Sequence, residues 1–354
     1  MKVGIIADQH IGVRNDSQFF SQFCIEYLRD DFIPRMKQND IQHVFHLGDV
    51  FDRRKYINFK TLSDWRQNFF DILCENKINL HVIVGNHDVY YKNTNDVNSM
   101  QLLDSYPNIF VYDKPHLWEN DGYKVFLCPW IPSGQEQQFI KELDEARSDI
   151  CFGHFELMGF DMFKGHQSTH GLSEEVLKKF RIVLSGHYHH RSTKSNITYV
   201  GSPYGMTWSD FGDPRGYHIF DFNDRSLQFF ENPKSMFIKF EYDDEHMSMN
   251  DLSNIDYNSF TNKYVKIIIK NKTNPYFLDK FLDNLYNKSP ADVSIVDLVF
   301  QKKNEDVSVD VGKDTKSILV DYIKNLQLSN EGDIIDFMSK LYHEAINLKM
   351  QEGT

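Results

Sequence analysis

Five short polar segments within the first 190 residues carry the side chains that could do chemistry. They combine carboxylates, imidazoles and a carboxamide, and none of them contains a cysteine. The segments are Asp8–His10, Gly48–Asp52, Gly85–Asp88, Gly153–His154 and Gly186–His189. Mixed nitrogen and oxygen ligands suit Mn²⁺, Fe²⁺ or Zn²⁺, and the lack of thiolates excludes an iron–sulfur cluster.

The number of candidate ligands is too large for a single ion that keeps open positions. Seven groups instead fit two ions that share a bridging carboxylate. Two metals about 3.5–4 Å apart are the usual arrangement for hydrolysing phosphate esters. Each motif alone has a plain alternative, since Gly48-Asp49 is a common turn and Asn86 could cap a helix. Their joint occurrence favours the metal site.

The elements that must position these segments form an alternating pattern. Each polar segment follows an apolar run, and longer amphipathic runs lie between the first three. Strands are expected at Val3–Ala7, Gln42–Leu47, Leu80–Val84, Lys124–Cys128, Asp149–Phe152, Arg181–Ser185 and Ile197–Val200, and helices at about Asp16–Lys37 and Thr61–Glu75. This alternation predicts a layered α/β fold. Ligands in such folds gather at the carboxyl ends of strands, so five strand ends can converge on one site.

The pattern changes after residue 216 and predicts three domains. Strands with tight turns are expected at Tyr217–Phe222, Ser226–Glu231 and Met236–Tyr242, followed by a polar linker at Asp243–Asn262. A small β-α-β unit is expected from strand Tyr264–Lys270, helix Pro275–Asn287 and strand Val293–Phe300. A polar stretch, Gln301–Lys313, precedes two amphipathic helices at about Thr315–Leu328 and Glu331–Lys349. The expected domains are therefore 1–242, 243–300 and 301–354.

Composition limits the class of protein. Of the 354 residues, 41% are hydrophobic and 25% are charged, as in a soluble globular chain. No apolar run is long enough for a transmembrane helix, and the N-terminus lacks a signal-peptide pattern. The four cysteines lie far apart, which is typical of reduced thiols in a cytosolic protein. The net charge of −12 argues against coating nucleic acid by charge, but a carboxylate site becomes cationic once metals fill it.

The five segments together resemble the signature of the calcineurin-like metallophosphoesterases. The SbcD-type DNA-repair nucleases are further resembled by Gly48–Asp52, by Gly153–Glu156 with His170-Gly171, and by Gly201–Tyr204 with Asp213–Gly216. Residues 48–55, 85–88, 106–115 and 213–216 resemble in particular the recombination endonuclease subunits of T-even-like bacteriophages. The resemblance covers roughly the first 220 residues. It implies a metallophosphoesterase β-sandwich flanked by helices, with a small α+β capping domain and C-terminal helices.

The resemblance also implies a role for each site residue. Asp49 would bridge two divalent ions, and the resemblance implies that these ions are Mn²⁺. The remaining ligands would be Asp8, His10 and His189 for one ion and Asn86, His154 and His187 for the other. His87 would donate a proton to the leaving oxygen, oriented by Asp88. Arg53 and Arg54 are candidates for holding DNA phosphates. Asp52 would either support a ligand or pair with one of these arginines.

The function implied is that of a nuclease subunit in DNA recombination, repair and replication. It would act as an exonuclease on duplex ends and an endonuclease on single strands, in the cytoplasm, or in the host cytoplasm if a phage encodes it. The tail helices would dock on a coiled-coil ABC-type ATPase or pack on their own domain, and a homodimer is left open. One rival is a phosphatase or small-substrate phosphodiesterase of the same superfamily. Another is a scaffold without metals, disfavoured because every ligand position is present.

Overall fold

The computed structural model describes residues 1–298, together with 323, 324, 332, 334, 335, 337 and 338. The polar stretch expected at Gln301–Lys313 lies outside the described residues. So do the helices expected at Thr315–Leu328 and Glu331–Lys349, apart from the single positions named above. Within the described part of the chain, no helix combines the length and apolarity that crossing a membrane would require.

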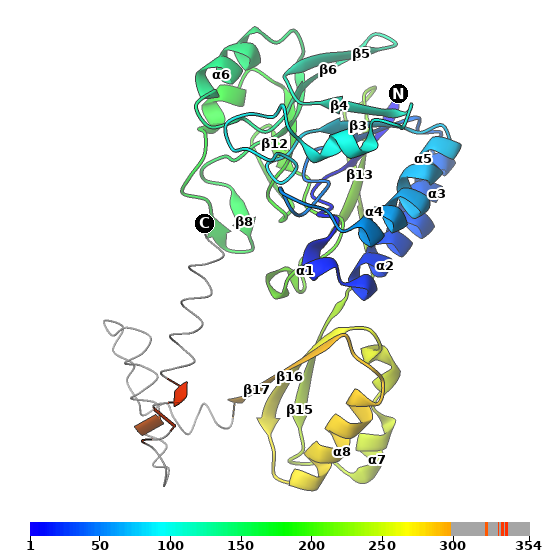
Figure 1. Cartoon of the computed structure of the whole chain (residues 1–354), viewed down its shortest axis with the longest axis vertical. Coiled ribbons are helices and arrows are strands. Elements are labelled where there is room, and N and C mark those ends of the chain that lie inside the picture. The colour runs from blue at the N-terminus through cyan, green and yellow to red at the C-terminus, as the bar shows by residue number, and fades with distance from the viewer. Residues whose placement is uncertain (299–322, 325–331, 333, 336, 339–354) are drawn as a thin grey trace.

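Two six-stranded sheets make up the larger part of the molecule (Figure 1). The first has the order β14-β13-β1-β2-β3-β4 and the second the order β11-β12-β10-β7-β6-β5. The first sheet contains β1 (Lys2–Ile6), β2 (His43–His46), β3 (Asn79–Ile83), β4 (Ile109–Tyr112), β13 (Gly216–Asp221) and β14 (Leu227–Glu231). The second contains β5 (His116–Asn120), β6 (Tyr123–Cys128), β7 (Ile150–His154), β10 (Ile182–Gly186), β11 (Ser192–Lys194) and β12 (Ile197–Tyr199). Strands β1 to β4 are parallel to one another, as are β6, β7, β10 and β12.

Alternation along the strands builds the core between the sheets. In β1, Val3 and Ile5 belong to the same buried cluster as Phe152 and Leu184 of the other sheet. Ile6, which points the opposite way, packs instead with the helices. Because successive side chains of a strand face opposite sides, one buried strand can serve two apolar layers at once.

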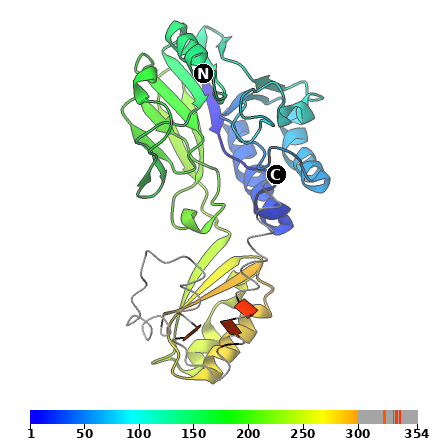
Figure 2. The same cartoon turned by 60° about the vertical axis from the view of Figure 1, so that its left-hand side comes forward.

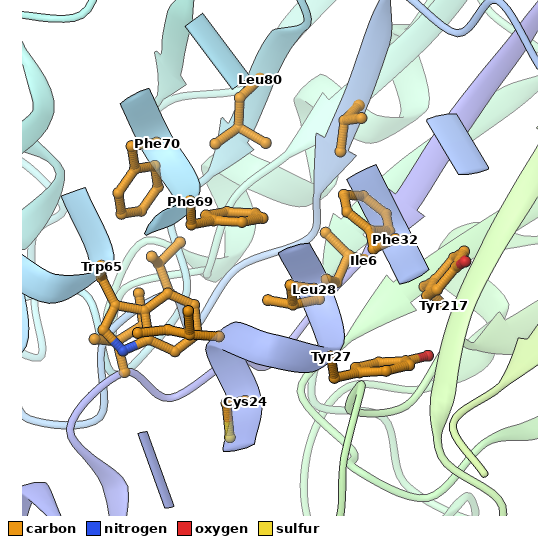
Figure 3. Close-up of a cluster of buried hydrophobic side chains, with 14 of the residues drawn as sticks. Ile6, Cys24, Tyr27, Leu28, Phe32, Trp65, Phe69, Phe70, Leu80 and Tyr217 are labelled. Atoms are coloured by element: carbon orange, nitrogen blue, oxygen red, sulfur yellow. The ribbon is translucent and has the colours of Figure 1, made fainter. Parts of the chain in front are cut away.

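Helices cover the outer face of the first sheet. They are α2 (Gln18–Tyr27), α3 (Ile33–Gln38), α4 (Phe59–Trp65) and α5 (Asp71–Glu75), and the short α1 (Val13–Asp16), which has no buried residue, precedes them. A π-helical turn joins α2 to α3 and another joins α4 to α5, so each expected helix is one nearly continuous run. Figure 3 shows Leu28 and Phe32 of one run beside Trp65, Phe69 and Phe70 of the other.

The second sheet is covered by α6 (Glu136–Glu145), whose Phe139 and Leu143 pack with Cys151 and Val183. A small hairpin, β8 (Asp161–Phe163) and β9 (His166–Gln167), follows β7. The predicted α/β sandwich flanked by helices is confirmed. Neither α6 nor the strands β4, β5, β8, β9 and β11 were expected.

A separate three-stranded parallel sheet forms the small unit, residues 237–297. It consists of β15 (Phe237–Asp243), β16 (Tyr264–Asn271) and β17 (Asp292–Asp297), with α7 (Met249–Asn254) and α8 (Pro275–Tyr286). The structure corrects two expectations here. Strand β15 pairs with β16 rather than with the large sheet, so this unit begins before residue 243. The segment expected as a linker, Asp243–Asn262, contains α7 and buries Leu252 and Phe260, because its few apolar residues fall where they can pack.

The small unit lies next to the larger part (Figure 2), and aromatic rings contribute to the contact between them. Trp208 packs edge-on against Phe237, with the ring centroids 5.0 Å apart. The guanidinium of Arg14 lies 4.1 Å from the centre of the Tyr264 ring. The Tyr264 hydroxyl donates to Ser17 Oγ at 3.2 Å. These contacts connect β15 and β16 to the segments that flank the polar edge of the sandwich.

Candidate metal centre

The carboxyl ends of five parallel strands, three from one sheet and two from the other, meet at one edge of the sandwich. Asp8 and His10 follow β1, Asp49 follows β2, Asn86 follows β3, His154 ends β7, and His187 and His189 follow β10. The two sheets face each other, so the loops of both can reach the same point. The structure thus brings together all seven side chains that the sequence nominated as ligands.

The backbone of this edge is bent in a way that side chains rarely allow. Asp8, His10, Asp49 and His187 all have positive φ, between 45° and 94°. Such residues typically cost about 1 kcal/mol or more each and concentrate at functional sites. Hydrogen bonds from Asp8 N to Gly48 O, 3.0 Å, and from His10 N to Asp49 O, 3.1 Å, hold the first two loops together. Gly48 is required because a Cβ there would lie 2.3 Å from His154 Nδ1.

The side chains form two adjoining ligand groups, and a third group that overlaps both joins His10 and Asp49 to His87. In one, Asp8, His10 and His189 offer ligand atoms within 4.8 Å of one another. In the other, Asp49, His154 and His187 do the same. His10 Nε2 and His189 Nε2 are only 3.0 Å apart, so two potential ligand atoms of the first group converge on one point.

Two oxygens complete these groups. Asn86 Oδ1 lies 2.9 Å from both His154 Nε2 and His187 Nδ1, and so joins the second group. Asp49 Oδ2 lies 3.6 Å from His10 Nε2 and 3.5 Å from His154 Nε2. Asp49 therefore stands between the two groups, where a bridging carboxylate must be.

Burial makes the charges of this cluster interdependent. Burial alone lowers the pKa of His154, but Asp49 and Asp8 outweigh it and raise the pKa to about 9. Burial also raises the pKa of Asp8 to about 6 and lowers that of His187 to about 3. Carboxylates and imidazoles that lie this close together and away from water are suited to binding cations between them. The donor set and its two-part geometry therefore fit two divalent ions.

His87 lies beside the ligands, but Asp88 does not orient it as expected. Its Nδ1 lies 2.6 Å from the backbone oxygen of Asp52, so this carbonyl accepts the Nδ1 proton and sets the ring. The Asp88 carboxylate instead accepts from the backbone N–H groups of Asp49, Phe51 and Gly85, at 2.8, 3.1 and 2.9 Å. The predicted pairing of Asp88 with His87 is wrong, because three loop amides occupy this carboxylate. Asp88 positions the loop that carries Asp49.

The structure separates the two interpretations of Asp52. Its Oδ1 lies 3.4 Å from His10 Nδ1, which fits support of a ligand. Arg53 pairs with Asp16 instead, at 2.7 Å. Arg53 and Arg54 both line a surface hollow near Tyr90, and Arg53 is in addition paired within the fold.

A buried network, missed from the sequence, ties together the loops that carry the first ligand group. The Tyr204 hydroxyl donates to the backbone oxygen of Gln9, 2.7 Å away, between Asp8 and His10. Ser202 N donates to the backbone oxygen of His189 at 3.1 Å. Arg215 Nη1 in turn donates to Ser202 Oγ at 3.1 Å. The Asp213–Gly216 string could have suggested such a network, since a buried arginine needs partners.

Trp130 was also missed, although its position offered a signal. It follows β6, a further strand end at the same edge of the second sheet. Its ring centroid lies 5.4 Å from that of His187 and 6.1 Å from that of His154. Applying the strand-end rule to every parallel strand would have found it, because the rule does not depend on ligand chemistry.

Comparison with known proteins gives matches over the same region. Residues 1–191 match the family described as "Calcineurin-like phosphoesterase". The chain is 32% identical over 351 residues to "Exonuclease subunit 1" of Enterobacteria phage T4, covering 98% of this chain and 99% of that protein. It is 24% identical over 260 residues to the SbcD subunit of the nuclease SbcCD from Staphylococcus epidermidis, covering 64% of this chain and 67% of that protein.

Proposed function

We propose that this chain, which belongs to the calcineurin-like phosphoesterase family, is a two-metal nuclease that hydrolyses DNA phosphodiesters. The observation that carries the proposal is the placement of Asp49 between two ligand groups. A carboxylate shared in this way suits a pair of ions that together hold one phosphate group. The name of the phage T4 relative, an exonuclease subunit, supports a nucleic acid as the substrate.

The first ion would be held by Asp8, His10 and His189, and the second by Asn86, His154 and His187, with Asp49 shared by both. When bound, the ions supply Lewis-acid chemistry: they activate water and neutralise charge on the phosphate oxygens. Imidazole-rich sites suit Mn²⁺ better than Mg²⁺, so manganese is the proposed metal.

His87 is the proposed general acid. The backbone carbonyl of Asp52 fixes its Nδ1, which leaves Nε2 free to give a proton to the leaving oxygen. The His87 ring lies 4.7 Å from that of His10, at the edge of the first ligand group. From there it can reach a phosphate ester held between the two groups. Asp88 contributes by fixing the backbone of the Asp49 loop.

The chain would act as the nuclease component of a recombination and repair complex with a coiled-coil ATPase. The name of the staphylococcal relative, one subunit of a nuclease, supports a shared assembly. We further propose exonuclease action on duplex ends, endonuclease action on single strands, a site of action in the cytoplasm, and a homodimer. The small unit would cap the DNA-binding edge, and residues 301–354 would contact the ATPase.

A nuclease assay on the full chain tests the proposal. Chelator-treated protein should cut neither duplex nor single-stranded DNA, and Mn²⁺ should restore cutting better than Mg²⁺. A generic phosphodiester, bis(p-nitrophenyl) phosphate, should be hydrolysed more slowly than DNA. Hydrolysis of the generic ester without any cutting of DNA would instead indicate a small-substrate phosphodiesterase.

A further inference from the structure

We propose that a hollow beside the second ligand group binds the nucleobase next to the scissile phosphate, with Trp130 as its stacking surface and Glu156 as a hydrogen-bond acceptor. The inference rests on the proposed nuclease function and adds a substrate subsite to it. The hollow is about 290 Å³, and its wall includes Trp130, Ile131, Phe155, Glu156, Leu172 and Glu136.

The hollow is continuous with the metal centre. His154, a member of the second ligand group, forms part of its wall. The Trp130 ring lies between the hollow and that group, with its centroid 5.4 Å from the centroid of His187. A flat group that stacks on Trp130 in the hollow would therefore have only this ring between it and His187.

Trp130 is held as a fixed platform. Its backbone N–H donates to Val84 O at 2.8 Å, which ties it to the end of β3. Its own backbone oxygen accepts from Asn95 Nδ2 at 2.8 Å. The side chain is half-buried, so one part of the indole packs on imidazoles while another lines the hollow. An aromatic ring that is already ordered can stack a base at little entropic cost.

Another part of the wall is built around Glu156. Gly171 has a φ of +104°, and a Cβ at this position would lie 2.3 Å from the Glu156 backbone oxygen. That oxygen accepts from Leu172 N at 2.8 Å, so the chain closes tightly here and fixes the rim. Any larger residue at 171 would push Glu156 out of place.

The chemistry of the wall favours a base over a phosphate. Among the residues that line the hollow, two are carboxylates and none is a lysine or arginine. Negative groups without a cation repel a phosphate, whereas aromatic and aliphatic walls accept a flat heterocycle. A carboxylate can accept from the exocyclic amino group of cytosine, and the same applies to adenine and guanine. Thymine lacks this amino group, so it should be the least favoured base.

The test uses the full chain with Mn²⁺ and end-labelled single strands that carry one abasic residue. Cleavage of one bond flanking the abasic residue should fall roughly 10- to 100-fold in the wild type, as expected for loss of one stacked base. The Trp130→Leu variant should cut every bond at the lower rate that the wild type shows beside the abasic residue. Its cleavage rate should not depend on whether the abasic residue is present. Trp130→Phe should restore the difference, which a merely structural tryptophan would not do.

Glu156→Gln tests the second contact. It should change the preference between thymine and cytosine at the same position, whereas Glu142→Gln on α6 should not. Equal cutting on both sides of the abasic residue by the wild type would overturn the subsite and leave the nuclease function intact. So would a loss of bound Mn²⁺ in Trp130→Leu, since the slower cutting would then arise at the ligands and not from a missing stacked base. Failure to cut any DNA would overturn both proposals.

Discussion

Two groups of histidines in this molecule look alike in the sequence and differ in their surroundings. At the metal centre, His154 faces the carboxylate of Asp49, and its pKa is raised to about 9 despite burial. Between the sheets, His43 Nδ1 lies 2.9 Å from His81 Nε2, and His81 Nδ1 lies 2.9 Å from the Tyr112 hydroxyl. Burial lowers the pKa of His81 to about 3. Both rings are buried, so it is the neighbouring carboxylate of Asp49, and not the degree of burial, that distinguishes His154 from His81.

The backbone separates the two groups as well. His43 and His81 lie within the regular strands β2 and β3, where their rings stack on neighbours such as Phe45. Most metal-centre residues lie just after strands, with His154 as the last residue of β7, and His10 and His187 have positive φ. His43 and His81 thus have the ordinary extended backbone conformation of their strands. His10 and His187 instead have a backbone conformation that costs free energy.

Removal of a carboxylate should break this contrast most completely. Asp49 approaches both ligand groups, so Asp49→Ala should release metal from both and reduce DNA cutting to the level of the chelated protein. His81→Phe should retain its metal and its turnover. Metal content by mass spectrometry and cutting of labelled DNA measure the pair. Retention of two ions by Asp49→Ala would show that Asp49 does not bridge.

Loss of the proposed general acid should have the next largest effect. His87→Asn should reduce turnover by about 10²–10⁴-fold while the metal content stays at the wild-type value, because a proton donor is lost and no ligand. His43→Asn, in the other histidine group, should leave turnover unchanged. If His87→Asn also empties a metal site, His87 is a ligand and the acid lies elsewhere.

A smaller effect is expected from the residue behind His10. Asp52→Ala should weaken Mn²⁺ binding by about 10- to 100-fold, the usual effect of losing a group that orients a ligand. Arg53→Gln breaks the ion pair with Asp16 and should leave the affinity unchanged. Titration with Mn²⁺, followed by electron paramagnetic resonance, measures both. Equal loss in the two variants would indicate that the whole loop, rather than Asp52, supports the site.

Much of this site could be predicted because it is local in sequence. Each ligand either ends a strand or follows one by at most four residues, and the parallel α/β pattern places such ends on one edge. The sequence pattern could not show that the Asp88 carboxylate accepts a hydrogen bond from a backbone amide of the Asp49 loop, because residue types do not reveal where backbone N–H groups point. Nor could it link Tyr204 to Gln9, which lies 195 residues away along the chain.

The elements of the fold were likewise predictable where their pattern is local in sequence. Helices and strands with a clear period were predicted, including the run that becomes α2 and α3. The sheet that β15 joins was not, because its alternating apolar residues fit the edge of either sheet. The segment Asp243–Asn262 reads as polar, yet Leu252 is fully buried by packing within the small unit. Which strands pair, and where a few apolar residues form a core, depends on tertiary contacts that composition does not reveal.

The smallest effect, on stability and its pH dependence, would sharpen the comparison from the structural side. His81 is neutral in the folded protein, with a pKa of about 3, whereas an unfolded histidine has a pKa of about 6.5. Between these values the unfolded chain binds more protons, so His81 contributes stability that is present above pH 6.5 and lost as the pH falls. Between pH 7 and pH 5 this loss should amount to about 1–2 kcal/mol.

Urea unfolding of His81→Phe should therefore show a free energy of unfolding that declines less steeply with falling pH than that of the wild type. The variant also loses its hydrogen bonds to His43 and Tyr112, but this loss applies at every pH. His116→Phe, at an exposed position, should keep the wild-type slope, and an equal slope in all three proteins would mean that His81 is not held neutral.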